Sequence, residues 1–279
     1  MKLITTIAAT AALLLTPTAW AAAVFTTFEG AGALVADLVV VRDSFRASIG
    51  GGDLPGANGS FGGLRREINW DGVPDARSDP NALPGDFFNV TSPRGAVFST
   101  PGTGFLVSSS GAGATPAVFG FPGDFATFSP LKLFTAVNSN ITDVRFFLPG
   151  STDSATTSAF GLFFTDVETP GSTKLEFFDS ADVLIYSRDA LTSGNRGLSF
   201  LGATVADGAI SRVRITAGLN TIRSNGALGN PNDDVVAMDD FIYAEPTRAQ
   251  DVPEPSSLAL AGMALLMTLV SSRRLRRRG

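Results

Sequence analysis

The sequence predicts an all-β protein: an antiparallel, jelly-roll-like β-sandwich with one short N-terminal amphipathic helix, plus a signal helix and a transmembrane helix at the chain ends. Three observations predict this class. Apolar runs of strand length recur in the second half, 30 glycines and 16 prolines interrupt the 279 residues, and 22 phenylalanines outnumber two tyrosines and two tryptophans. Such an excess of phenylalanine is typical of a packed core rather than of a polar cleft.

The first residues predict a secretory signal peptide over 1–21. The basic Lys2 precedes an apolar run over 3–15, and the small-x-small pattern Ala19-Trp20-Ala21 follows. This order of basic, apolar and cleavage regions is typical of chains exported by the Sec machinery. We expect cleavage after Ala21 or Ala23.

The body is expected as one β-sandwich domain over residues 24–245. It opens with a strand over 24–28. Leu38, Val41, Phe45 and Ile49 then recur at helical spacing, and the glycines at 50–52 end this helix.

Short strands with turn-rich breaks follow the helix, and the pattern is clearest in the second half. There we expect strands over 144–148, 159–167, 174–178, 183–187, 199–205, 210–216 and 235–243. Seven short strands at this spacing favour an antiparallel sandwich. A short linker over 246–251 completes the body.

The composition excludes most familiar catalytic sites. The chain has no histidine and no cysteine, so it cannot form a Ser-His-Asp triad, a thiol nucleophile, a disulfide or a Cys-type zinc site. Between positions 22 and 253 it carries 15 basic and 25 acidic residues. This balance argues against nucleic acid as a partner and favours a cation or a neutral sugar.

Acidic residues at the two ends of the body are the candidate metal ligands. Glu29 closes the first predicted strand, and Asp239 and Asp240 lie in the last one. The first and last strands of an antiparallel sandwich are commonly neighbours, so these carboxylates could meet and hold a structural Ca²⁺. Solvated acids at strand ends are the plainer interpretation, and both interpretations also apply to the acidic loop 232–234.

A polar segment over 64–72 is the candidate ligand site. Asn69 and Trp70 could bind a sugar by hydrogen bonding and stacking, with Tyr186 as another platform, but a lone tryptophan in a polar loop more often fills the core. A structural ion network that pins an irregular loop is the favoured alternative. A glycosidase would need a carboxylate pair such as Glu67 with Asp71, or Asp166 with Glu168.

The C-terminal segment 252–279 combines three parts: Val-Pro-Glu-Pro-Ser-Ser, an apolar run over 258–270, and an arginine cluster. Thirteen helical residues cover ~20 Å against a hydrocarbon core of ~30 Å, so the flanking serines must extend the span to about 257–271. The arginines then fix the C-terminus on the cytoplasmic side.

This segment resembles the PEP-CTERM protein-sorting domain of Gram-negative, exopolysaccharide-producing bacteria. The residues that match it are Pro253, Glu254, Pro255, Arg273, Arg274, Arg276, Arg277 and Arg278. The body also resembles the β-sandwich proteins often found upstream of this signal, through residues 65–71 and 238–241. No activity accompanies that resemblance.

The resemblance implies an exosortase substrate that passes through the inner membrane to the cell surface or extracellular matrix. We therefore expect a non-enzymatic surface or matrix protein, with exopolysaccharide as a candidate partner. A carbohydrate-binding module is the alternative, and a carboxylate-dependent glycoside hydrolase is a more distant one. If calcium is bound, chelation should lower the melting temperature.

Overall fold

The structure, a computed structural model, describes residues 23–52, 59–109, 119, 123–206, 208, 210–222 and 234–248. The predicted signal peptide, the predicted transmembrane helix and the sorting residues lie outside the described residues, as do Asn232 and Asp233. Within the described part of the chain, no helix is long and apolar enough to cross a membrane.

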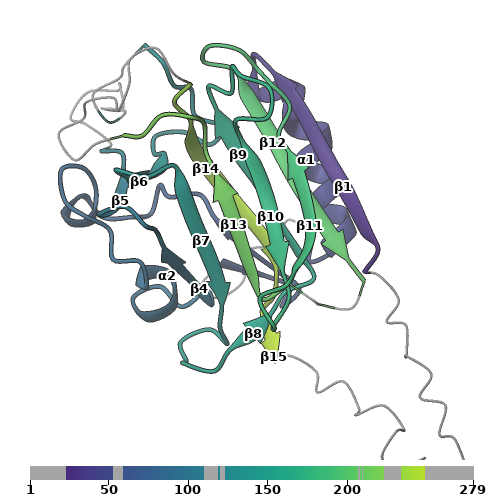
Figure 1. The fold of residues 1–279 in the computed structure, drawn as a ribbon. Coiled ribbons are helices and arrows are strands. Elements are labelled where there is room, and N and C mark those ends of the chain that lie inside the picture. The colour runs from purple at the N-terminus through teal and green to yellow at the C-terminus, as the bar shows by residue number, and fades with distance from the viewer. Residues whose placement is uncertain are drawn as a thin grey trace, which may run out of the picture.

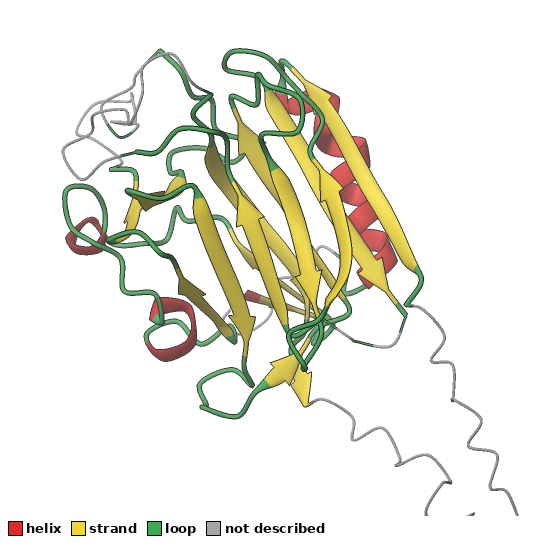
Figure 2. Ribbon diagram, viewed as in Figure 1, coloured by secondary structure: helices red, strands yellow, loops and turns green. Residues whose placement is uncertain are grey.

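Two antiparallel sheets form the body (Figures 1 and 2), which confirms a mostly β fold. In the described residues the larger sheet has eight strands and the smaller sheet has five. The jelly-roll-like connectivity stays a prediction.

The larger sheet contains β1 (Phe25–Gly32), β2 (Ser60–Phe61), β3 (Arg65–Ile68), β5 (Gly104–Val107), β6 (Phe134–Val137), β9 (Ala159–Thr165), β12 (Leu198–Val205) and β14 (Ala237–Ala244). Its order is β1-β12-β9-β14-β3-β2, and β6 pairs with both β14 and β5.

The smaller sheet contains β4 (Ala96–Ser99), β7 (Ile141–Phe146), β10 (Lys174–Phe178), β11 (Leu184–Asp189) and β13 (Arg212–Thr216). Its order is β11-β10-β13-β7-β4. A two-stranded ribbon pairs β8 (Ala155–Thr156) with β15 (Thr247–Arg248), so residues expected in the linker form a strand. All seven strands predicted in the second half of the chain are present.

Apolar side chains from both sheets form the main core. Phe160 and Phe164 of β9 belong to the same buried cluster as Val213 and Ile215 of β13. On β13 these aliphatic residues alternate with arginines, as period-two patterning predicts. The arginines instead lie beside the Asp143 carboxylate on β7, with nitrogen to oxygen distances of 2.7 to 3.0 Å.

Helix α1 (Val35–Ile49) covers the other face of the larger sheet (Figure 1). Its start is fixed by Asp37, whose carboxylate accepts the Leu34 N–H at 2.9 Å, and Gly50 ends it with φ +97°. Phe45 packs onto β9 and β12 where Gly161 faces Gly202 across the strands. A Cβ at Gly161 would lie 2.8 Å from the Gly202 Cα, so position 161 needs glycine, whereas a Cβ at Gly202 would lie 3.1 Å from the rings of Phe45 and Phe200.

Two short helical segments were not predicted: α2 (Phe87–Val90) and the 3₁₀ turn η2 (Asp75–Arg77). Phe87 and Phe88 of α2 are buried against the main core. In the sequence they form one of several aromatic pairs with no helical repeat around them, so periodicity could not distinguish this turn from a strand.

Candidate functional site

Six of the predicted site residues gather around one end of β3 and the middle of β14: Glu67, Asn69, Trp70, Asp71, Asp239 and Asp240. Asp239 pairs with Phe163 on β9, and Phe241 pairs with Leu162, so Asp240 is an extra residue in the strand. A bulge of this kind bends the strand and redirects its side chains. It places two adjacent carboxyl groups in a buried part of the larger sheet.

Asp239 is held by backbone amides. Its Oδ2 accepts the N–H groups of Phe128 at 2.7 Å and Ser129 at 3.2 Å, and its Oδ1 accepts the Asp240 N–H at 2.8 Å. The side chain is fully buried and attaches the 128–129 segment to the sheet. Burial, and then the charge of Asp240, raise the pKa of Asp239 well above its usual value.

The hydrogen-bonding capacity of Asp240 is less fully used than that of Asp239. It is 7% exposed, and among the described residues its Oδ1 has no hydrogen-bond partner. Burial raises the pKa of Asp240 to about 6, and the charges of Glu67 and Asp71 act in the same direction. These effects make ionisation of Asp240 costlier than that of an exposed aspartate, although with a pKa of about 6 the charged form still predominates at neutral pH.

Glu67 belongs to an ion network. Its carboxylate accepts hydrogen bonds from Arg46 at 2.8 and 2.5 Å and from Arg65 at 2.7 Å. Arg65, only 1% exposed, also donates to the carbonyls of Gly50 and Gly52. Two arginines thus neutralise Glu67 and join β3 to the end of α1, while the adjacent Arg66 pairs with Glu245 instead.

Asp71 and Asn69 lie on the loop after β3. Asp71 accepts the Lys132 N–H at 3.1 Å, and burial raises its pKa above the usual value. Asn69 is exposed, and its backbone carbonyl accepts the Ser129 hydroxyl at 3.4 Å. These contacts hold the loop against the segment that Asp239 also binds.

Trp70 lies in the core. The side chain is 1% exposed, and its ring stacks on Phe134 at 4.1 Å between centroids, with edge contacts to Phe88 and Phe241. Its backbone φ of +65° turns the chain so that the ring points inward. In this position the ring has no free face for a sugar. Tyr186 likewise stacks on Phe25, at 4.6 Å between centroids.

Glu29 does not reach the aspartate pair. β12 and β9 separate β1 from β14, so the expectation that the first and last strands are neighbours is wrong. β1 is instead the edge strand of the larger sheet. In the described residues it pairs only with β12, and α1 covers it. Those residues contain no group of three or more acidic side chains arranged to hold a metal ion.

A second acidic group, which we call the acidic end, consists of Asp124, Asp166, Glu168 and Asp234. Asp166 follows β9 and its Oδ1 accepts the Arg196 N–H at 2.7 Å. Burial raises the pKa of Asp166 to about 7, and the charges of the other three acids add to this. Proximity in the sequence pairs Asp166 with Glu168, but no sequence pattern adds Asp124 to them.

Asp234 has a structural role in this group. It accepts the N–H groups of Glu168 at 3.3 Å and Thr169 at 3.2 Å, and the Ser172 hydroxyl at 2.6 Å. These bonds fix the turn after β9. A carboxylate occupied in this way is a poor candidate for acid or base catalysis.

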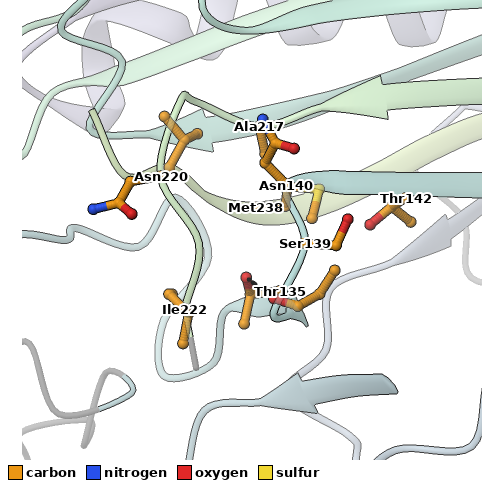
Figure 3. Close-up of a pocket in the computed structure, with 10 residues that line it drawn as sticks. Thr135, Ser139, Asn140, Thr142, Ala217, Asn220, Ile222 and Met238 are labelled. Carbon is orange, nitrogen blue, oxygen red and sulfur yellow. Dashed lines mark hydrogen bonds between the residues drawn. The ribbon is translucent and has the colours of Figure 1, made fainter. Parts of the chain in front are cut away.

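A small uncharged cleft opens at one end of the core (Figure 3). It is too narrow to admit a water molecule, and its described lining residues include no acid or base. Thr142 is 1% exposed, and within the described residues its hydroxyl has no partner. Met238 and Thr135 also line the cleft (Figure 3). The cleft supplies no group for general acid–base chemistry.

Comparison with known proteins concerns the C-terminal segment. Residues 251–277 match the PEP-CTERM protein-sorting motif. The chain carries a PEP-CTERM motif. This confirms the resemblance seen in the sequence, and the motif implies an exported protein that an exosortase processes and that is sorted to the cell surface.

The body has no comparable match. No curated protein matches the chain. A solved structure, the enzymatically active domain of tailspike protein 4 of bacteriophage CBA120, is 12% identical over 58% of this chain, with a TM-score of 0.27. The match covers only 20% of that chain. A likeness this weak supports no conclusion about the body.

Proposed function

We propose that the body is a non-enzymatic component of the cell surface or of an exopolysaccharide matrix, to which the PEP-CTERM motif delivers it. The single observation that carries this proposal is the match of residues 251–277 to the sorting motif. The composition of the body is compatible with a structural protein outside the cytoplasm. It has no cysteine to oxidise, and a large aromatic core stabilises it.

The candidate acids support a structural role for the body. Glu67 is neutralised by two arginines, and Asp239 and Asp234 are occupied by backbone N–H groups. A glycoside hydrolase needs one carboxyl that donates a proton and another that acts as base or nucleophile beside an open site. A sugar-binding module would need a platform other than Trp70, whose ring is buried; Tyr186 is half-buried and stacks on Phe25.

The proposal can be tested by complementation of a strain that lacks the gene. We expect the wild-type chain and the Glu67→Gln/Asp71→Asn variant to restore matrix cohesion equally, because neither carboxylate performs chemistry. Circular dichroism of the purified variant confirms that it is folded. A folded variant that fails to restore cohesion, or wild-type protein that hydrolyses an isolated polysaccharide, would contradict the proposal.

Delivery can be tested separately by cell fractionation. In cells with an exosortase the chain should be at the surface or in the matrix. In cells without the enzyme it should remain with the inner membrane. Equal distribution in both strains would contradict the assigned route.

A further inference from the structure

Both ends of the described chain leave the body at the same end of the larger sheet. Thr26 pairs with Thr204, and Thr204 pairs with Ala159. Tyr243 pairs with Phe160, which places the end of β14 in the same row. Three strand spacings separate β1 from β14, or about 14 Å. We call this region the junction end: the start of β1, the 179–183 turn, and the β8–β15 ribbon (Figure 1).

The sequence limits how far the junction end can stand from the membrane. Residues 249–257 separate Arg248 from the apolar run of the sorting motif. Nine residues span at most about 30 Å even when fully extended. While that run occupies a bilayer, the junction end therefore stays close to the lipid surface.

The surface of the junction end suits a lipid headgroup region. Val24 is 78% exposed, and Val183 and Leu184 are 55% and 48% exposed. Phe25 contacts Tyr186, so the start of β11 lies beside the start of β1.

Most charges near these apolar side chains are paired, and Asp179 of the same turn accepts the Ala181 and Val183 N–H groups. Arg248 lies 2.7 Å from Asp153, and Arg145 lies 3.4 Å from Asp182. Pairing leaves little net negative charge to be repelled by anionic headgroups.

The opposite end of the larger sheet carries acidic side chains. Thr165 and Leu198 lie there, about 20 Å along β9 and β12 from the junction end. The acidic end, defined above, follows directly after Thr165. A group of carboxylates is repelled by the negative potential of an anionic membrane. The charge distribution therefore favours one orientation of the body over the reverse.

We propose that the junction end docks on the lipid bilayer while the sorting motif is inserted, so that the acidic end points away from the membrane. This inference rests on the proposed delivery route, because it requires the apolar run over 258–270 to enter the bilayer. Docking in this orientation also holds the PEP residues next to the membrane surface, where a membrane protease can reach them.

Single-cysteine labelling tests the orientation directly, because the native chain has no cysteine. The full chain would carry Val183→Cys at the junction end or Leu219→Cys near the acidic end. Both side chains are 55% exposed, and the Leu219 N–H donates to the Asp234 carbonyl. A fluorophore is attached to each variant, and the proteins are inserted into phosphatidylethanolamine–phosphatidylglycerol vesicles that contain a headgroup quencher.

We expect several-fold stronger quenching at position 183 than at position 219. A second pair, Leu184→Cys and Leu191→Cys, repeats the comparison along β11 and its extension, with exposures of 48% and 42%. Unchanged melting temperatures establish that the labelled variants are folded. Equal quenching of both members of each pair, or stronger quenching at 219 and 191, would overturn the inference.

Flotation of the vesicles tests membrane insertion separately from the orientation of the body. Full chain that floats with lipid but shows equal quenching overturns the orientation alone. A chain that does not float contradicts membrane insertion, and the orientation falls with it.

Discussion

Arg188 on β11 donates from Nε and Nη2 to the two carboxylate oxygens of Glu29 on β1, at 2.8 and 2.6 Å. This pair joins the edge strands of the two sheets. The stacked rings of Phe25 and Tyr186 lie beside it. Edge strands tend to pair with other chains, and covering them with side chains limits this. Glu29, expected as a calcium ligand, therefore serves in the described structure to close one side of the sandwich.

This position of Glu29 predicts the outcome of a calcium test. The melting temperature of Glu29→Gln should respond to EDTA as that of the wild-type chain does, because Glu29 is separated from Asp239 and Asp240 by two strands. Thermal melts of both proteins with calcium and with EDTA provide the measurement. A response to EDTA in the wild type that is absent in the variant would show that Glu29 is a ligand.

Trp70 is expected to stabilise the core. Replacing it with alanine removes the stacked contact with Phe134 and leaves a cavity, so the free energy of unfolding should fall by about 3–5 kcal/mol. Trp70→Phe is the matched control and should cost only about 1–2 kcal/mol, because it keeps an aromatic ring and the indole N–H has no partner in the described residues. Urea unfolding followed by circular dichroism measures both. Equal stability of Trp70→Ala and wild type would contradict burial of this ring.

Stability should depend on pH through Asp166. Its pKa is about 7 in the folded chain, above the usual 3.8, so the native state binds more protons than the unfolded state between these values. Stability is therefore greatest at low pH in this window and falls as pH rises from about 4 to about 7.

Asp166→Asn removes this dependence. Asparagine tolerates the φ of +74°, and its amide oxygen can still accept the Arg196 N–H. At pH 8 we expect the variant to be more stable than wild type by about 1–2 kcal/mol, a value reduced for solvent screening. At pH 4 the two should be equal. A variant less stable than wild type at pH 8 would contradict the account.

Replacing Asp239 or Asp240 with alanine should change the stability of the protein by different amounts. Asp239→Ala leaves the Phe128 and Ser129 N–H groups without their acceptor, so we expect a loss of about 2–4 kcal/mol. Asp240→Ala removes a carboxylate whose Oδ1 has no partner among the described residues and whose ionised form is destabilised by burial, so at pH 8 it should leave stability unchanged or raise it. Chemical denaturation at pH 8 compares them, and equal losses would contradict the separate roles.

Local patterns predicted much of the fold. The strands of the second half could be found because apolar runs such as the one that forms β9 are bounded by turn residues. Helix α1 could be found from its apolar spacing and the glycines that follow it. Both signals are contained in a few consecutive residues.

Strand order and the site depended on contacts far apart in the chain. That β12 and β9 lie between β1 and β14 follows from packing of the whole sheet, which no local pattern records. The inward turn of Trp70 depends on a positive φ at a non-glycine residue, which is rare and cannot be inferred from composition. The grouping of Asp124 with Asp166 likewise required the folded chain.

The most direct test of the central claim is the mass of the chain released by cells with an exosortase. We predict a released chain that lacks the apolar run over 258–270 and the terminal arginines, and no such product when the exosortase is deleted or when Pro253, Glu254 and Pro255 are all replaced by alanine. Release of the full-length C-terminus, or the same truncated mass in all three strains, would contradict the assignment of this chain to exosortase-dependent sorting.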